Sequence, residues 1–134
     1  MYGRSKFHAK KVEFGGERFD SKLEMKRWLY LRSLSDSGEI TALRRQVEYE
    51  VVPRQTELVC VRMKTKEKFV EKFREHPVYY KADFVYEVDG KEVIEDTKGF
   101  RTPEYIIKRK LMRLNGHPIR EVAKATEPVR LTEE

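Results

Sequence analysis

A hairpin in the second half of the chain constrains the fold most. The stretch YYKADFVYEVDGKEVIEDTKG, residues 79–99, holds two runs rich in aromatic and β-branched residues on either side of Asp89-Gly90. This dipeptide is the strongest short-range signal for a two-residue hairpin turn, because both central residues of that turn need a positive φ. Such a turn pairs Val88 with Lys91 and, further along, places Asp83 opposite Asp96. The sequence therefore predicts an antiparallel strand pair with two facing carboxylates.

Facing carboxylates are costly unless something neutralises them. Directly opposed side chains lie about 5 Å apart, and two negative charges at that distance repel by roughly 3 kcal/mol at an effective dielectric of about 20. A cation bound between them would turn this repulsion into a binding site. Alternatively, Lys81 and Lys98 neutralise the two acids along the diagonals of the hairpin. The hairpin alone leaves both interpretations open.

Strand alternation separates the neighbouring acids Glu95 and Asp96. Side chains of a strand point to alternate faces, so Asp96 shares a face with Asp83. Glu95 lies on the other face, which looks like the core side because of its aromatic and aliphatic residues: Tyr80, Ala82, Phe84, Tyr86, Val88 and Val93. We therefore expect Asp96, and not Glu95, to act together with Asp83.

The remaining elements predict one α/β (α+β) domain over residues 1–134. Ser21-x-x-Glu24 is a capping signature that starts a helix running to about Ser35, and Thr102-Pro103 starts a second helix that ends at Gly116. We expect a short hairpin at 12–19 and strands at 46–52, 57–63 and 119–123. This order predicts a mixed sheet with a helix on each face. The charged segment 64–76 has apolar residues at helical spacing or forms a mobile insertion, and we expect the tail 126–134 to fray.

The net charge of +6 is concentrated in two segments. Residues 1–11 form a basic N-terminal arm without an acid, and residues 98–113 hold six basic residues against one acid. Two basic clusters on an otherwise balanced chain favour a polyanionic partner, with nucleic acid ahead of a membrane surface. The residues expected to contact nucleic acid are Arg4, Lys6, Lys10, Lys11, Lys108, Arg109, Lys110 and Arg113.

The location of the chain is expected to be cytoplasmic. Its single cysteine supports no disulfide framework and fits a reducing compartment. The basic N-terminus lacks the apolar region of a secretory signal, and no apolar run is long enough to span a membrane. We interpret the cysteine, Cys60, as a small core residue.

The chemistry-bearing residues together resemble the PD-(D/E)XK nuclease superfamily. Asp83 precedes Asp96-Thr97-Lys98 on the adjoining strand, Glu24 lies in an early helix, and a basic helix follows. The likeness is greatest to small phage and prophage endonucleases of the endonuclease I and Holliday-junction-resolvase type, and it spans most of residues 6–114. It implies a restriction-endonuclease-like core and a metal-dependent endonuclease acting on DNA in the host cytosol, with branched DNA as one candidate substrate and a homodimer as one candidate state.

The resemblance also implies roles for individual residues. Glu24, Asp83, Asp96 and Lys98 would be catalytic, and Glu24, Asp83, Asp96 and the Thr97 carbonyl would bind Mg²⁺, with Mn²⁺ as a substitute. Mg²⁺ prefers such hard oxygen ligands and assists phosphodiester hydrolysis. Lys98 would orient or deprotonate the attacking water.

Other interpretations remain open at this stage. Glu24 has roles available other than metal binding. It could serve just to close the capping box on Ser21, or it could pair with Arg27. The whole chain could instead be a non-catalytic basic nucleic-acid-binding protein with a nuclease-like fold, or the endonuclease subunit of a transposase or restriction-like system.

Overall fold

The computed structural model describes residues 11–97 and 100–129. In chain order its elements are β1 (Val12–Phe14), β2 (Glu17–Phe19), α1 (Lys22–Asp36), β3 (Thr41–Val52), β4 (Gln55–Arg62), β5 (Glu67–Glu75), β6 (Val78–Val88), β7 (Lys91–Thr97), α2 (Pro103–Leu114) and β8 (Ile119–Val122).

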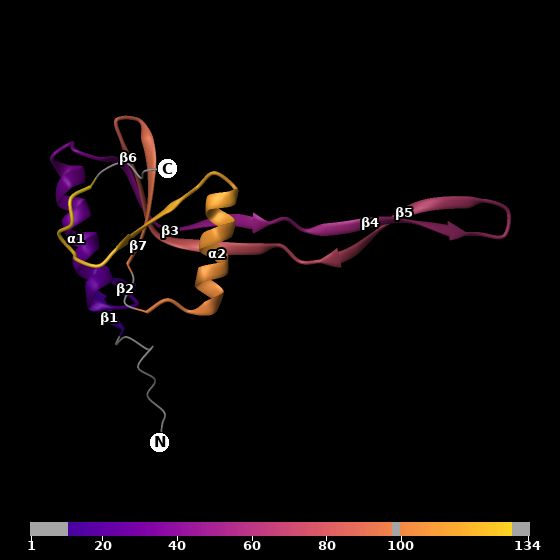
Figure 1. Ribbon diagram of the computed structural model, residues 1–134, viewed down its shortest axis with the longest axis horizontal. Coiled ribbons are helices and arrows are strands. Elements are labelled where there is room, and N and C mark those ends of the chain that lie inside the picture. The colour runs from indigo at the N-terminus through magenta and orange to yellow at the C-terminus, as the bar shows by residue number, and fades with distance from the viewer. Residues whose placement is uncertain (1–10, 98–99, 130–134) are drawn as a thin grey trace, which may run out of the picture.

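A four-stranded mixed sheet organises the body, in the order β3-β6-β7-β8, with β8 parallel to β7 and the other pairs antiparallel. The two helices lie on opposite sides of it (Figure 1). Leu31 of α1 is buried against Phe84 on one face, whereas Met112 of α2 is buried against Val85 on the other. The predicted α+β architecture, a mixed sheet with a helix on each face, is thus confirmed.

The predicted hairpin has the expected register. β6 and β7 pair antiparallel from Val88↔Lys91 to Phe84↔Glu95. Asp89 and Gly90 have φ values of 53° and 79°, as a two-residue turn that follows the strand twist requires. Turn chemistry at one dipeptide therefore sets the register of both strands.

Both predicted helix starts are also confirmed. The Ser21 hydroxyl accepts a hydrogen bond from the Glu24 N–H at 3.1 Å, and the Thr102 hydroxyl accepts one from the Tyr105 N–H at 3.0 Å. These caps satisfy N–H groups that have no partner inside a helix.

Segment 64–76 does not form the helix that its apolar spacing allowed, because residues 67–75 form a strand. The alternative, a mobile insertion, stays a prediction. β5 pairs antiparallel with β4, with Phe69 opposite Cys60. The spacing of Phe69 and Phe73 suits a helix, but it also suits a strand in which every second residue shares a face. The hairpin formed by β4 and β5 packs into neither core cluster. Cys60 is therefore exposed and is not the core residue that the sequence suggested.

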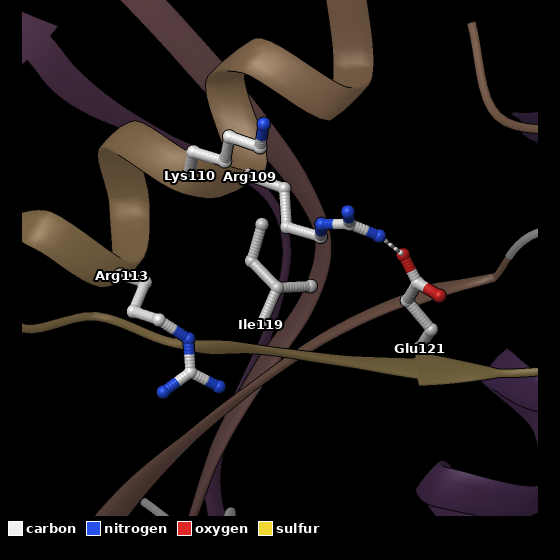
Figure 2. Close-up of a pocket in the computed structure, with 5 residues that line it drawn as sticks. All are labelled: Arg109, Lys110, Arg113, Ile119 and Glu121. Carbon is white, nitrogen blue, oxygen red and sulfur yellow. Dashed lines mark hydrogen bonds and ion pairs between the residues drawn. The ribbon is translucent and has the colours of Figure 1, made fainter.

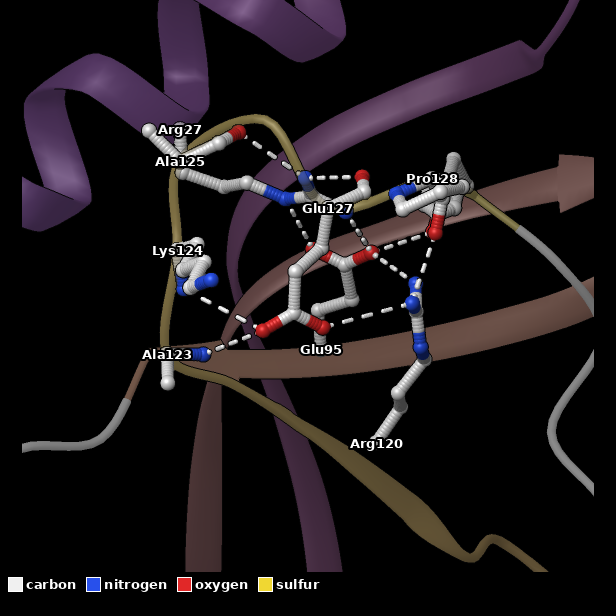
Figure 3. Close-up of polar contacts among 9 residues, drawn as sticks. Arg27, Glu95, Arg120, Ala123, Lys124, Ala125, Glu127 and Pro128 are labelled. Carbon is white, nitrogen blue, oxygen red and sulfur yellow. Dashed lines mark hydrogen bonds and ion pairs between the residues drawn. The ribbon is translucent and has the colours of Figure 1, made fainter.

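The start of the tail is placed against the body by hydrogen bonds. Arg27 is fully buried and donates to the carbonyl oxygens of Ala125 at 2.9 Å and Glu127 at 2.6 Å. Arg120 donates to the Pro128 carbonyl at 2.6 Å (Figure 3). Residues 126–129 therefore follow the body, while 130–134 lie outside the described residues.

Candidate active site

In β3 and β6, the side chains switch from one face of the sheet to the other near Asp83. In β3, Leu43 packs on the α1 side of the sheet, but Val47, four residues later, packs on the α2 side. In β6, Ala82 packs on the α2 side and Phe84 on the α1 side. Strict alternation would keep each of these pairs on one face. The alternation therefore breaks between them, and the prediction that Tyr80 and Ala82 share the face of Phe84 is wrong.

A left-handed residue accounts for the break. Gln46 has φ 53°, which is uncommon for a residue other than glycine, and it has no register partner between Arg45↔Phe84 and Val47↔Ala82. Asp83 is the residue that would lie opposite it. Such strained backbone in a strand re-aims nearby side chains and often marks functional sites.

A cavity of about 500 Å³ opens beside this break. We call it the carboxylate cavity. Its walls come from β3, β6, β7, α2 and the segments preceding both helices. The lining residues are Asp20, Gln46, Tyr80, Lys81, Asp83, Asp96, Thr102, Glu104, Tyr105 and Lys108. Asp83 and Asp96, the two acids expected to act together, thus reach one open site.

Hydrogen bonds hold both aspartates in place. Oδ2 of Asp83 accepts from the Thr97 backbone N–H at 2.9 Å and from the Thr97 hydroxyl at 2.8 Å. Oδ2 of Asp96, only 3% exposed, accepts from the Tyr80 hydroxyl. Burial and the Asp96 charge raise the pKa of Tyr80 well above its usual value, so the phenol stays protonated and keeps donating.

Glu24 lies just behind the cavity and combines two roles. One oxygen accepts the Asp20 N–H at 2.9 Å, which closes a capping box shifted by one residue from the expected Ser21 N–H. The other oxygen accepts from the Gln46 amide at 3.2 Å, and the Arg45 guanidinium lies 3.5 Å away. Glu24 is therefore more than a cap, because Gln46 links it to the cavity wall.

The charge of Glu24 is poorly compensated. Burial, followed by the negative charge of Asp83, raises the pKa of the Glu24 carboxyl from 4.5 to about 7. A bound cation would reverse both effects, and carboxylate oxygens are the ligands that Mg²⁺ prefers. The donor chemistry therefore fits Mg²⁺, although in residues 11–97 and 100–129 no three acidic, histidine or cysteine side chains converge closely enough to form a metal cluster by themselves.

Glu95 is separate from this site. Its fully buried carboxylate accepts from the Arg27 Nε at 2.8 Å and from Arg120 at 3.2 Å (Figure 3). It also accepts from the Tyr86 hydroxyl. Arg27 thus pairs with Glu95 and not with Glu24. The two adjacent acids point to opposite faces, as strand alternation predicted.

The predicted basic residues fall into four groups. Lys108 lines the carboxylate cavity and pairs with Glu104 at 2.9 Å. Lys11 pairs with Asp20 at 3.0 Å, and both side chains are exposed. Lys98, Arg4, Lys6 and Lys10 lie outside the described residues.

The fourth group surrounds a second cavity of about 430 Å³, which we call the basic cleft. Arg109, Lys110 and Arg113 of α2 line it together with Ile119 and Glu121 of β8 (Figure 2). Arg109 donates to Glu121 at 3.2 Å. Partial burial favours the neutral Glu121 carboxyl, but hydrogen bonds from Arg101, Tyr105 and Arg109 outweigh it and lower the pKa of Glu121 to about 2. No acid in the described part of the chain pairs with Lys110 or Arg113.

Sequence reasoning missed two residues of the site. Tyr80 was assigned to the wrong face, and no signal in the sequence announces the strand break that turns it toward Asp96. Gln46 was expected only to open a strand. It is exposed, but its amide also contacts Glu24, and its left-handed backbone has no signature because glutamine does not favour that conformation.

Comparison with known proteins gives one match. No curated protein and no solved structure matches the chain, and no helix in the described ranges is long and apolar enough to cross a membrane. The model of one protein family, described as "Protein of unknown function (DUF1064)", matches residues 4–127. This match covers the helices, the sheet, the carboxylate cavity and the basic cleft, so the chain belongs to the DUF1064 family.

Proposed function

We propose that this protein is a metal-dependent endonuclease with a restriction-endonuclease-like core that hydrolyses DNA phosphodiester bonds. The observation that carries the proposal is the convergence of Asp83 and Asp96, from neighbouring strands, on one open cavity beside a strained residue. Asp83 is partly exposed at this cavity and Asp96 is buried beside it, and both carboxylates are fixed by hydrogen bonds that they accept.

Asp83, Asp96, Glu24 and the Thr97 carbonyl would hold Mg²⁺. The ion would offset charge on the scissile phosphate and make a water molecule more acidic. The protein supplies the geometry: Thr97 fixes Asp83, Tyr80 fixes Asp96, and Gln46 connects Glu24 to the wall of the cavity. Lys98, two residues beyond Asp96, would orient the attacking water or take up its proton.

DNA would lie across α2. Lys81 and Lys108 are at the carboxylate cavity, and Lys110 and Arg113 are at the basic cleft. Cations on both sides of the helix can therefore contact phosphates on either side of a cleavage point. The resemblance to resolvase-type enzymes makes branched DNA the first substrate to test.

A cleavage assay tests the activity. The protein is incubated with four-way junction, duplex and single-stranded DNA, with and without Mg²⁺ or Mn²⁺. We expect cleavage only with metal, and its loss in Asp83→Asn and Asp96→Asn, which keep side-chain size and remove charge. Asp36→Asn, at the exposed end of α1, is the matched control. Full activity in either active-site variant would refute the assignment. Metal-independent binding without cleavage by the wild type would favour a non-catalytic DNA-binding protein.

A pair of lysine variants tests the role of Lys98. Lys98→Ala should lower the cleavage rate about a hundredfold or more, as expected for a lost proton-transfer or electrostatic group, while DNA affinity is kept. Lys81→Ala should cost less than about tenfold, because Lys81 lies at the cavity only to balance charge or contact DNA. Equal losses at saturating Mg²⁺ would contradict the role given to Lys98.

A further inference from the structure

A two-stranded arm extends away from the body of the molecule. It consists of β4, β5 and their turn, residues 55–75, and continues the direction of β3 and β6 beyond the sheet (Figure 1). None of its residues belongs to either core cluster. An isolated two-stranded hairpin is only marginally stable in water. We therefore expect the arm to be stabilised by packing against a second surface.

One face of the arm carries an apolar strip. The register places Leu58, Cys60, Phe69 and Phe73 on the same side. Leu58 and Phe69 are each 69% exposed and Phe73 is 42% exposed. Single exposed apolar residues are common on protein surfaces, but a contiguous strip on an unsupported ribbon indicates an interaction site.

The charges around the strip disfavour DNA as its partner. Glu67 and Glu71 lie on this face. Of the two cations at the strip, Arg62 already pairs with Glu67 at 2.9 Å, and the Arg54 guanidinium lies over the Phe73 ring, 5.2 Å from its centroid. Phosphates need unpaired cations and are repelled by acids. An apolar strip edged by both charges suits another protein surface instead.

The charge pattern is self-complementary. Along the strip, the Cys60↔Phe69 pair lies midway between Arg62↔Glu67, toward the tip, and Leu58↔Glu71, toward the body. In a symmetric dimer both copies use the same patch. If the twofold axis passes through the central pair, the tip half of the strip of one copy packs against the body half of the strip of the other copy. Arg62 then lies between Glu67 of its own chain, with which it already pairs, and Glu71 of the partner subunit, and the central phenylalanines cover each other.

We propose that the arm is a dimerisation device and that its occupant is the arm of a second copy of this chain. Burial of the central apolar residues holds the copies together, and the two symmetric Arg62–Glu71 contacts set the orientation. This inference does not depend on the proposed nuclease activity, because it uses none of the residues of the carboxylate cavity.

Sedimentation velocity over a wide concentration range tests the dimer. The wild type should sediment as a dimer that dissociates on dilution. Leu58→Ser with Phe69→Ser should be monomeric at concentrations where the wild type is dimeric, and its core should unfold at the same denaturant concentration. Leu114→Ser is the matched control, since Leu114 is 81% exposed but lies on α2; this variant should remain dimeric.

A mixing experiment separates self-association from an intrachain effect. Arg62→Glu and Glu71→Arg should each weaken the dimer when studied alone. Mixing the two variants should restore it, because both symmetric contacts then join opposite charges.

A wild type that is monomeric throughout, an arm variant with unchanged mass, or a mixture without recovery would overturn the proposal. Loss of DNA affinity at unchanged mass would overturn it in favour of a DNA-contacting arm. The readout is mass, so a failure here leaves the cleavage assay unaffected.

Discussion

Single residues at the carboxylate cavity show how far a sequence can specify a site. Asp83 and Asp96 could be identified in advance because one turn fixed their register and strand alternation fixed their face. Tyr80 and Gln46 could not be identified, since both depend on the reversal of faces at Gln46. That reversal is set by tertiary packing against two helices, and it costs backbone strain that no local preference predicts.

Glu24 should make the metal-free protein less stable as pH rises. Its carboxyl has a pKa of about 7 in the folded state, against an ordinary value of 4.5, so the folded protein holds the extra proton between these values. A group that binds its proton more tightly when folded stabilises the fold only while it stays protonated. The free energy of unfolding should therefore fall by up to about 3 kcal/mol from below pH 4.5 to above pH 7 on account of this group.

Glu24→Gln isolates this effect. The variant keeps an acceptor for the Asp20 N–H but cannot ionise, so its advantage over the wild type should grow with pH in urea unfolding experiments. Adding Mg²⁺ at alkaline pH should restore stability to the wild type and leave the variant unchanged. A stability difference that does not vary with pH would show that the folded-state pKa is not raised.

Whole elements were predictable where strong terminal signals surround them. Both helices begin at their cap residues, and the β6–β7 hairpin turns at Asp89-Gly90. β5 was misassigned because its apolar residues fit both a helix and a strand, and its pairing partner β4 lies outside that window. The start of β3 was placed at Gln46 although the strand begins at Thr41. Left-handed residues at Ala42 and Gln46 break the alternation by which a strand is recognised.

The buried ion pair between α1 and β7 should be essential to how these elements dock. Arg27 and Glu95 are both fully buried and joined by two hydrogen bonds of 2.8 and 2.6 Å. Removing one member of such a pair leaves the other charge uncompensated, so Arg27→Ala should lower the free energy of unfolding by about 3–5 kcal/mol. It should also release residues 125–128, which would be seen as increased proteolysis near the C-terminus.

A double substitution distinguishes charge from packing in this network. Arg27→Met with Glu95→Met removes both charges and keeps apolar volume, so it should recover much of the stability lost in Arg27→Ala. Urea unfolding of the single and double variants provides the comparison. A loss below about 1 kcal/mol in Arg27→Ala would mean that the pair contributes little to the docking of α1.

At the scale of the whole molecule, the sheet divides the protein into two differently charged sides. α1 covers one face through an aromatic and aliphatic cluster, with the buried Arg27–Glu95 pair beside it. α2 covers the other face and separates the carboxylate cavity from the basic cleft. The concentration of basic residues in α2 was visible in the sequence. Their distribution over two cavities was not, because it depends on how the helix is rotated against β8 and β6.

This rotation predicts unequal contributions of the α2 cations to DNA binding. Each phosphate contact adds about 0.9 to the slope of log K against log salt concentration, because a counterion is released. Lys110 and Arg113 have no acidic partner in the described residues, so replacing both with Gln should reduce the slope by about two units and weaken binding to all sequences alike. Arg109→Gln should have a smaller effect, since Arg109 already pairs with Glu121 at 3.2 Å.

Arg32→Gln, an exposed substitution on α1 across the sheet, is the control and should leave the slope unchanged. Fluorescence anisotropy with labelled DNA at several salt concentrations measures all four proteins, and equal slopes for α1 and α2 variants would show that α2 is not the DNA-binding side.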